Sequence, residues 1–440
     1  MQRWLPEPFI LAIILTLVVM LSAMPICHQS LNEVIEHWGN GVWSLLTFAM
    51  QMALVLVCGS ALATAPSIKR GIEILASIPK SSTAAILWVT LISCVACWIN
   101  WGFGLIIGVV FAKEIAKKVR VDYRLLIASA YSGFVVWHAG FSGSIPLTMA
   151  TKGAQLSEVT QGAVVNAIPL SQTIFSLPNI LIVLTVVVVL LIVNVCMQSK
   201  ENAVFVNPDL LKEDSQPIVY ENTPAEKLEN SVILGYLVSF LGLAYLAVQF
   251  FVKHVSLELN HVIMIFLILG LLFHKTPIAY VRAFSHAVQG SAGIMLQFPF
   301  YAGIMGVLMG VGESGLCLGT EISDFFIRIA TPHTYPIMTF LSAGIVNVFV
   351  PSGGGQWAVQ APIMFATGKQ LGVDPAITGM AIAWGDAWTN LIQPFWALPA
   401  LAIAKLNAKD IMGFCLINLI LIGIVISVGL LIWSWLPMPY

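Results

Sequence analysis

The chain has 440 residues, of which 58% are hydrophobic and only 9% are charged. Soluble domains carry about 25% charged residues, so the composition excludes a soluble protein and predicts an all-α polytopic membrane protein in a lipid bilayer. The formal net charge is −1 and the basic residues form no stripe, so nothing points to nucleic acid as a partner.

The first half of the chain, residues 1–198, contains both continuous and interrupted spans. Continuous apolar spans are expected at about 8–27, 43–66 and 173–196, with an amphipathic surface helix at 67–80.

Two further apolar segments of this half are interrupted near their middle. Residues 84–116 are interrupted by Asn100-Trp-Gly-Phe-Gly104, and residues 124–151 by Gly140-Phe-Ser-Gly-Ser-Ile-Pro146. Gly and Pro disfavour helix, and backbone released at membrane depth is tolerated only where it is buried in protein or lines a cavity. We therefore expect a re-entrant helical hairpin at 84–116 and a broken transmembrane helix at 124–151.

The second half, residues 231–440, follows an acid-rich polar loop, residues 199–230. Continuous spans are expected at about 231–252, 261–274, 291–311 and 411–435, with amphipathic pieces at 275–286 and 316–330. A hairpin is expected at 335–369, interrupted at Pro351–Gln356, and a broken helix is expected at 375–404, interrupted at Asp386–Pro394. A tight contact between helices would explain two Gly four residues apart, but not a consecutive Pro-Ser-Gly-Gly-Gly.

The basic residues test this arrangement, because cytoplasmic loops are enriched in Lys and Arg. If 84–116 and 335–369 both return to the face they entered from, 16 of the 20 Lys and Arg fall inside and 4 outside. If 84–116 crossed the membrane instead, the five basic residues in and after its end would face outward. We therefore expect a cytoplasmic N-terminus, a cytoplasmic loop 199–230 and a C-terminus on the opposite side of the membrane.

Two parts of the chain are alike at an offset of roughly 250 residues. Asn100-Trp-Gly-Phe-Gly104 corresponds to Pro351-Ser-Gly-Gly-Gly355, and the amphipathic segment 67–80 corresponds to 316–330. An odd number of crossings separates the two parts, so they would have opposite orientations. Two inverted repeats, each with a re-entrant helical hairpin and a broken transmembrane helix, are typical of secondary transporters, whose site lies between the halves.

The four breaks supply the candidate substrate site. N–H groups released at the N-terminus of a half-helix, which carries about half a positive charge, suit a carboxylate. Hydroxyl and amide side chains in the breaks could add hydrogen bonds, although capping a broken helix is an equally good role for any single one. The predicted substrate-binding residues are Asn100, Gly102, Ser142, Gly143, Ser144, Ser352, Gly353, Gly354, Gly355, Gln356, Asn390 and Gln393.

Asp386 lies within an apolar span, whereas the other acids fall in loops, amphipathic pieces or segment ends. A charged Asp in the bilayer core costs roughly 3 kcal/mol or more, so an intramembrane acid is a candidate for function. Burial favours a protonated carboxyl, while released carbonyls nearby would suit Na⁺. We therefore expect Asp386 to bind the coupling ion, with His138 as a proton partner. The alternatives are an Asp bonded to a helix break and a satisfied core His.

The charge pattern also bears on the substrate. No Lys or Arg lies deep in a span, so a small anion must be held by helix dipoles and hydroxyls, or carried neutralised by H⁺ or Na⁺. A dicarboxylate or phosphate would call for an Arg clamp, which favours a monocarboxylate. No metal-ligand spacing is present, so no cofactor is expected apart from Na⁺ as a coupling ion. Tryptophans near the breaks either wall an apolar pocket or only pack, namely Trp137, Trp357, Trp384, Trp388 and Trp396.

Longer motifs cover nearly the whole chain: Phe48-Ala-Met-Gln-Met-Ala-Leu54, Asn100-Trp-Gly-Phe-Gly104, Gly140-Phe-Ser-Gly-Ser144, Leu296-Gln-Phe-Pro-Phe-Tyr-Ala-Gly303, Val350-Pro-Ser-Gly-Gly-Gly355 and Gln393-Pro-Phe-Trp-Ala-Leu-Pro-Ala-Leu-Ala402. With these motifs the chain resembles the bacterial short-chain fatty acid transporter family, the acetoacetate and butyrate carriers. That family is a distant branch of a larger ion-transporter superfamily, and the resemblance implies inverted repeats with re-entrant hairpins. Two positions depart from the family pattern: Gln356 stands where His is expected, and Asp386 where Glu is expected.

The predicted function is a secondary active transporter, not an enzyme, that takes up short-chain fatty acids such as butyrate or acetoacetate with H⁺ or Na⁺, and that could form a homodimer. One alternative is a Na⁺-coupled carrier of another small organic anion, and another is a passive anion channel. An intramembrane enzyme would need a nucleophile and a base. Ser352 near Asp386 and His138 is the one candidate set, and no motif supports it.

Overall fold

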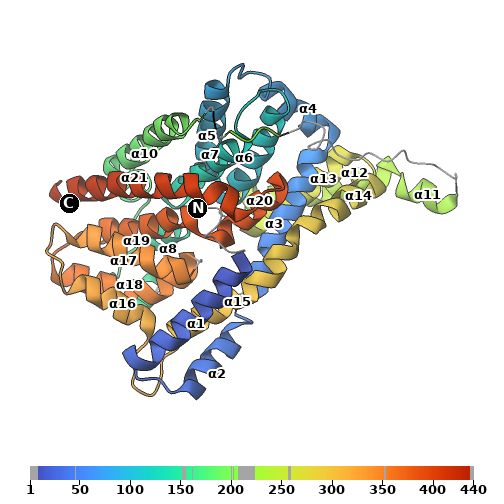
Figure 1. The fold of residues 1–440 in the computed structure, drawn as a ribbon. Helices are drawn as coiled ribbons and strands as arrows, with labels where there is room; N and C mark the ends of the chain where they lie inside the picture. The colour runs from blue at the N-terminus through green and yellow to red at the C-terminus, as the bar shows by residue number, and fades with distance from the viewer. Residues whose placement is uncertain are drawn as a thin grey trace.

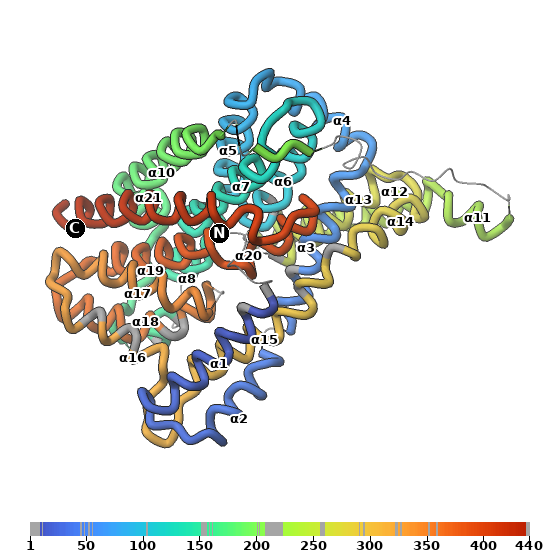
Figure 2. Tube along the Cα trace, in the orientation of Figure 1, coloured from blue at the N-terminus to red at the C-terminus, as the bar shows by residue number. Residues whose placement is uncertain are grey.

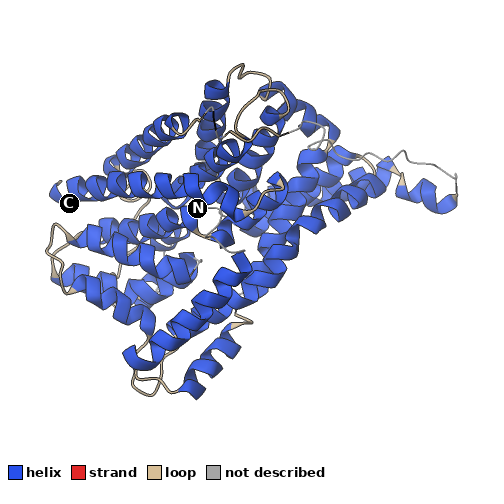
Figure 3. Cartoon of the chain, viewed as in Figure 1, coloured by secondary structure: helices blue, strands red, loops and turns tan. Residues whose placement is uncertain are grey.

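The computed structural model describes residues 8–44, 46–150, 155–160, 162–199, 201, 203–206, 223–255, 259–350 and 353–436. Every regular element within these ranges is a helix (Figure 3). Five of the described helices are long and apolar enough to cross a membrane, and a sixth is counted if a pair bent by 82° forms one span. The predicted class, an all-α polytopic membrane protein, is therefore confirmed.

The chain folds into helices separated mostly by short connections. The first half contains α1 (Pro8–Ile26), α2 (Leu31–Gly41), α3 (Leu46–Thr64), α4 (Pro66–Leu75), α5 (Ser82–Ile99), α6 (Trp101–Ala116), α7 (Tyr123–Ser132), the 3₁₀ helix η1 (Gly133–Ala139), α8 (Ser144–Ala150), α9 (Gln155–Val159) and α10 (Leu177–Cys196). The second half contains α11 (Pro224–Glu229), α12 (Val232–Ala247), the π-helical turn η3 (Val248–Val252), α13 (Leu259–His274), α14 (Pro277–Val288), η4 (Gln289–Ser291), α15 (Ala292–Met309), α16 (Leu318–Ile327), α17 (Tyr335–Phe349), α18 (Gly353–Gln370), α19 (Pro375–Thr389), η5 (Asn390–Ile392), α20 (Pro394–Ala404) and α21 (Ala408–Trp435).

Apart from α9, α11 and α12, the described helices follow the same order in both halves. The series α1 to α4 is an apolar helix, a short amphipathic helix, a second apolar helix and a second amphipathic helix, and α13 to α16 repeat it. A helix pair, a helix broken by a 3₁₀ turn and a long final helix then follow in each half. The opposite orientation of the two halves stays a prediction.

Each half contains a helix pair that folds back on itself. A single residue, Asn100, separates α5 from α6, and a Cβ built on Gly104 would clash with the backbone N of Cys97. In the other pair the Gln356 amide on α18 donates to the carbonyl of Ala343 on α17, over 2.8 Å. The predicted hairpins at 84–116 and 335–369 thus correspond to antiparallel pairs, α5 with α6 and α17 with α18, and their re-entrant course stays a prediction. The predicted extent of the interruptions is wrong, because Trp101–Gly104 and Gly353–Gln356 form the first turns of α6 and α18, where N–H groups need no partner within the helix.

The broken helices lie inside the molecule. In the most apolar window of Tyr123–Ala150, 89% of residues are buried, against 28% for Leu177–Cys196 and 33% for Ala408–Trp435. Burial of a polar group in such an interior is costly unless the group is hydrogen-bonded. The outer helices α10 and α21 lie side by side and leave one face open to lipid (Figure 1).

The remaining helices include two groups, each of which contains helices from both halves of the chain. α1 and α2 pack against α15, while α13 and α14 pack against α3 (Figures 1 and 2). The helix α2, which the sequence did not predict, begins with a capping box in which Ser30 and Glu33 bond each other's backbone N–H. Exposed apolar side chains on α12, such as Ile233 and Leu241, suit contact with lipid.

A buried polar network ties the outer helices to the interior. The Asn194 amide of α10 donates to Thr90 Oγ1 of α5 over 3.1 Å and to Ser132 Oγ of α7 over 3.0 Å. The Asn418 amide of α21 donates to Asn194 Oδ1 over 2.9 Å. All four side chains are fully buried, so loss of Asn194 removes a hydrogen bond from each of the other three.

Replacement of Asn194 by Leu, which is similar in size, is expected to lower the free energy of unfolding by about 1–3 kcal/mol, because buried polar partners lose their hydrogen bonds. The apparent Tm of the purified protein in detergent measures the effect. The control is Leu184→Ala on the same helix, where the side chain is 56% exposed and little change is expected. Equal Tm values for the two variants would show that the network contributes no stability.

Candidate functional site

A buried pair of ionisable side chains lies between the two broken helices. Asp386 of α19 and His138 of η1 are in contact, with Oδ2 3.0 Å from Nδ1, and both side chains have no exposed surface. The other ring nitrogen, Nε2, lies 3.2 Å from the donating N–H of Ile145 and 3.0 Å from Ser144 Oγ. A backbone N–H only donates, so Nε2 accepts and Nδ1 carries the hydrogen in the neutral ring. The protonated nitrogen of His138 therefore faces the carboxylate.

The contact between His138 and Asp386 does not satisfy either carboxylate oxygen. Neither Oδ1 nor Oδ2 of Asp386 has a hydrogen-bond partner among the described residues, and the Nδ1–Oδ2 contact is close without being aligned as a hydrogen bond. Buried polar atoms are nearly always hydrogen-bonded in native proteins. The site is therefore suited to a bound proton or cation on Asp386.

The break between η1 and α8 is held against the tip of the first hairpin. Phe141 N–H donates to the carbonyl of Trp98 over 2.8 Å, and Trp101 N–H, at the start of α6, donates to Ser142 Oγ over 2.9 Å. A Cβ on Gly140 would clash with the Trp98 carbonyl, and one on Gly143 with the His138 carbonyl. Only glycine permits these approaches, so the predicted residues Ser142 and Gly143 shape the break.

The tip of the second hairpin rests on the ionisable pair. Gly353, the first residue of α18, is buried, and a Cβ built there would lie 2.8 Å from His138 Cε1 and 3.1 Å from Asp386 Oδ2, and would clash with Ser144 Oγ. The next residue, Gly354, is exposed and has open space beside it. The N-terminus of α18 therefore meets the pair on one side and open space on the other.

The break between α19 and α20 is held by Asn347 of α17. Its amide donates to the carbonyl of Asp386 over 2.8 Å, to Thr389 Oγ1 over 2.9 Å and to Asn390 Oδ1 over 2.7 Å. The Gln393 amide donates in turn to the carbonyl of Asn347. Sequence reasoning did not single out Asn347, although an Asn in an apolar helix is a signal of the same kind as Asp386.

Several buried polar atoms near this break lack hydrogen-bond partners within the described ranges. They are Asn347 Oδ1, Gln356 Oε1, Asn390 Nδ2 and Gln393 Oε1. Their clustering around the Asp386 break leaves donors and acceptors for water or a polar ligand.

The structure brings together some of the predicted residues more closely than others. His138, Ser144, Gly353 and Asp386 share one cluster, and Asn390 and Gln393 join it through Asn347. The remaining predicted residues lie at the hairpin tips: Asn100, between α5 and α6; Gly102, buried in the first turn of α6; Gly355, in the first turn of α18; and Gln356, whose amide bonds within its own hairpin. Ser352 lies outside the described residues.

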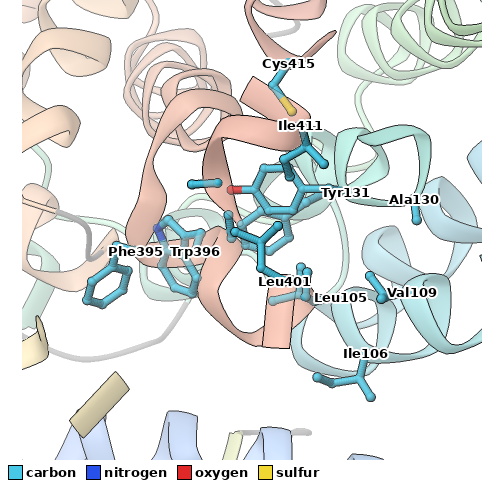
Figure 4. Close-up of a cluster of buried hydrophobic side chains, with 14 of the residues drawn as sticks. Leu105, Ile106, Val109, Ala130, Tyr131, Phe395, Trp396, Leu401, Ile411 and Cys415 are labelled. Atoms are coloured by element: carbon cyan, nitrogen blue, oxygen red, sulfur yellow. The ribbon is translucent and has the colours of Figure 1, made fainter. Parts of the chain in front are cut away.

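Aromatic side chains form one wall beside His138. Trp137 stacks on the His138 ring at 4.0 Å between centroids, and Trp101 lies 5.3 Å from Trp396 edge to face. Figure 4 shows Trp396 and Phe395 of α20 packed near Tyr131 of α7. Two of the five predicted tryptophans, Trp137 and Trp396, therefore belong to this wall.

The other three tryptophans pack elsewhere. Trp384 donates to Asn179 Oδ1 over 3.0 Å, Trp388 donates to the carbonyl of Leu419 over 2.7 Å, and Trp357 packs on Phe365. Within the described part of the chain, no group of three His, Cys, Asp or Glu side chains could hold a metal ion.

A buried acid between hairpin tips and broken helices, in a protein with several membrane spans, is typical of secondary transporters. A model of the family described as short chain fatty acid transporter matches residues 1–433. The chain belongs to this family, which confirms the resemblance seen in its motifs.

Two relatives extend over almost the same length. A protein of Escherichia coli (strain K12) that carries the provisional name short-chain fatty acid transporter is 43% identical over 434 residues, which cover 98% of this chain and 96% of the relative. A protein of Haemophilus influenzae (strain ATCC 51907 / DSM 11121 / KW20 / Rd) with the same provisional name is 41% identical over 436 residues, with the same coverage.

Solved structures of transporters align over nearly the whole chain. The YdaH transporter of Alcanivorax borkumensis aligns with 97% of this chain and 98% of its own, at 14% identity and a TM-score of 0.45. MtrF of Neisseria gonorrhoeae aligns with 99% of this chain and 97% of its own, at 16% identity and a TM-score of 0.38. A likeness of this degree adds nothing to the family assignment.

Gly353→Ala is expected to lower the free energy of unfolding by about 1–3 kcal/mol, because the new methyl group overpacks the space beside Ser144, His138 and Asp386. Gly354→Ala is the matched control: it makes the same change in the same helical turn, but into open space, so a shift below about 0.5 kcal/mol is expected. Thermal unfolding of both purified variants measures the difference. Indistinguishable Tm values would contradict the packing of Gly353 against the pair.

Proposed function

We propose that the protein is a secondary active transporter that takes up short-chain fatty acids, butyrate and acetoacetate among them, together with H⁺ across the bacterial inner membrane. The observation that carries the proposal is the fully buried contact of Asp386 with His138 directly beside Gly353 at the tip of the second hairpin. The family and the names of the relatives support the substrate class.

The N-terminus of α18 is the proposed position of the substrate carboxylate. A helix N-terminus offers unpaired N–H groups and a partial positive charge, which suit an anion. Gly354 in its first turn faces open space, so a ligand can approach the backbone there. At the first hairpin, by contrast, Gly102 in the first turn of α6 is buried. This difference favours the second hairpin as the anion site.

The arrangement of hydrogen bonds supports H⁺ over Na⁺ as the coupling ion. Transporters with broken helices coordinate Na⁺ with released backbone carbonyls. Here the carbonyls of Asp386 and Asn390 accept from Asn347 and Tyr131, and the carbonyl of Asn347 accepts from Gln393. A proton needs only one oxygen of Asp386, and both are without hydrogen-bond partners among the described residues.

The proposed anion site at the start of α18 lies close to Asp386, the proposed proton site, and this proximity gives a reason for coupled binding. Two like unit charges 4 Å apart repel by roughly 4 kcal/mol at an effective dielectric constant of 20. A substrate carboxylate at the start of α18 therefore binds better when Asp386 is protonated, and binding of the proton and of the anion support each other. This linkage is what a symporter requires.

Asp386→Asn is expected to abolish accumulation of butyrate driven by a pH gradient in proteoliposomes, because Asn keeps the shape of a protonated Asp but cannot release the proton. Exchange of labelled for unlabelled butyrate should persist, since it needs no proton release. The control is Asp374→Asn at the other end of the same helix, where the carboxylate caps the N–H of Ala376. Normal gradient-driven accumulation by Asp386→Asn would falsify the coupling role.

One series of counterflow measurements tests both the substrate range and the dependence on Na⁺. Saturated acids of two to six carbons are compared with and without Na⁺ in proteoliposomes. Uptake that does not depend on Na⁺ and is selective for short chains is expected. Dependence on Na⁺ would favour the alternative carrier. An inside concentration of labelled acid that never exceeds the outside concentration would favour a passive channel.

A homodimer is also part of the proposal. The mass of the purified protein in detergent measures it.

The proposed topology has the N-terminus in the cytoplasm and the C-terminus in the periplasm, with the two hairpins entering from opposite faces. Lys117, just beyond α6, and Lys369, in the last turn of α18, are then expected on opposite sides of the membrane. Cysteines placed at these positions, with the exposed Cys196 replaced by Ser, are labelled in intact cells by an impermeant reagent. Labelling of Lys369→Cys alone is expected, and labelling of both from outside would contradict the inverted arrangement.

A further inference from the structure

A cavity of about 300 Å³ lies away from the proposed site, between α3 and α4, α6, α14 and α20. Its lining includes three lysines, Lys69, Lys113 and Lys405, together with His286 and a single carboxylate, Glu114. Both halves of the chain therefore contribute basic side chains to one partly open cavity.

The lining of this cavity has a positive balance of charge. Three Lys against one Glu leave the lining residues with a net formal charge of +2, with His286 counted as neutral. Walls of low dielectric constant focus such a potential and raise the local concentration of anions. The cavity is thus suited to an anionic ligand.

The rest of the lining is mostly apolar, and Ser60, Thr64 and Gln289 are its uncharged polar members. Leu56, Ile72, Val110 and Ile403 contribute hydrocarbon surface next to the lysines. A carboxylate head on a short alkyl chain matches both parts of this surface. The volume lies at the small end of the range for ligand pockets, which suits a molecule of a few carbon atoms.

Two helices connect the cavity with the proposed site. α6 begins at Trp101, beside the first break, and reaches Lys113 about 18 Å further along, at 1.5 Å per residue. α20 begins at Pro394, beside the break at Gln393, and ends next to Lys405. The two helices pack against each other, so the cavity lies at the far end of a seam that starts at the site.

Apolar side chains close this seam. Leu105, Ile106 and Val109 of α6 and Leu401 of α20 belong to one buried cluster between the two ends (Figure 4). All four are nearly or fully buried. A charged solute in the cavity is therefore separated from Asp386 by packed hydrocarbon in this conformation.

We propose that the cavity is a second monocarboxylate site, a vestibule that concentrates the substrate anion at the end of the α6–α20 seam. The proposal rests on the proposed function for the identity of the substrate. The headgroup of an anionic lipid is the competing ligand for a basic cavity between membrane helices. The apolar lining beside the lysines and the seam towards the breaks favour the free monocarboxylate.

The test uses Ser60→Cys, a small change in a residue that lines the cavity, in the full-length protein with the exposed Cys196 replaced by Ser. The rates of modification by a negatively charged and by a positively charged methanethiosulfonate are measured in nanodiscs of zwitterionic lipid. The ratio of anionic to cationic rate is expected to fall by about tenfold or more when Lys69, Lys113 and Lys405 are all replaced by Gln.

The matched control replaces three lysines that do not line the cavity, Lys80, Lys227 and Lys409, by Gln, and should leave the ratio unchanged. A fall of equal size in the control would show that the general surface charge, not the cavity, sets the ratio, and would overturn the proposal. Circular dichroism and thermal unfolding show whether both triple variants are folded.

Protection identifies the ligand. Butyrate should slow modification of Ser60→Cys in the native lysine background, whereas butyramide, the neutral analogue, should not. Equal protection by both compounds, or no protection by butyrate, would overturn the proposal. Protection that requires phosphatidylglycerol in the nanodisc would assign the cavity to a lipid headgroup and would also overturn it.

The measurement is independent of transport, because modification needs no gradient and no coupling residue. It is therefore repeated with Asp386→Asn, where the same protection by butyrate is expected. Loss of gradient-driven uptake with protection retained would affect only the coupling mechanism. Normal uptake by the wild-type protein without protection would reject the vestibule and leave the proposed function standing.

Discussion

The buried contact between His138 and Asp386 is the constraint on which the centre of this protein depends. Two ionisable side chains without exposed surface are tolerated only if neighbouring groups compensate for lost hydration. For His138 the compensation comes from a chain break, because the N–H of Ile145 bonds its ring and fixes its tautomer. The start of α18 lies against both residues, while the oxygens of Asp386 have no hydrogen-bond partner among the described residues. In a continuous helix the N–H groups at these positions would bond to carbonyls of the same helix, so they could not provide either contact.

The breaks in turn need their own partners, because backbone released inside a membrane protein must be hydrogen-bonded. Ser142 accepts from the start of α6, Asn347 donates to the carbonyl of Asp386, and Tyr131 donates to the carbonyl of Asn390 over 2.5 Å. These three side chains come from different elements. The broken helices are therefore held in place by the hairpins and by each other, which makes the proposed site a property of the assembled interior.

The proposed site and the proposed vestibule would bind a carboxylate with different groups. The vestibule uses lysines near the ends of α6 and α20, where full positive charges are compatible with access to water. The proposed site uses helix-terminal N–H groups, because a Lys or Arg fully buried in a span would be costly to desolvate. A monocarboxylate that is weakly held in both places can be released again, which a carrier needs.

The sequence alone determined the helical class, the approximate places where helices are interrupted and the singular Asp386, because these follow from hydrophobicity, from Gly and Pro, and from the cost of a charge in an apolar span. It did not determine the exact breaks, since Trp101–Gly104 and Gly353–Gln356 are helical. Tertiary structure decided which break meets which. His138 and Asp386 lie in different halves, and only packing brings them to 3.0 Å. Packing also buried Gly353 while leaving its neighbour Gly354 open, and it gave Asn347 three partners. No local pattern encodes these differences, because they depend on residues far apart in the chain.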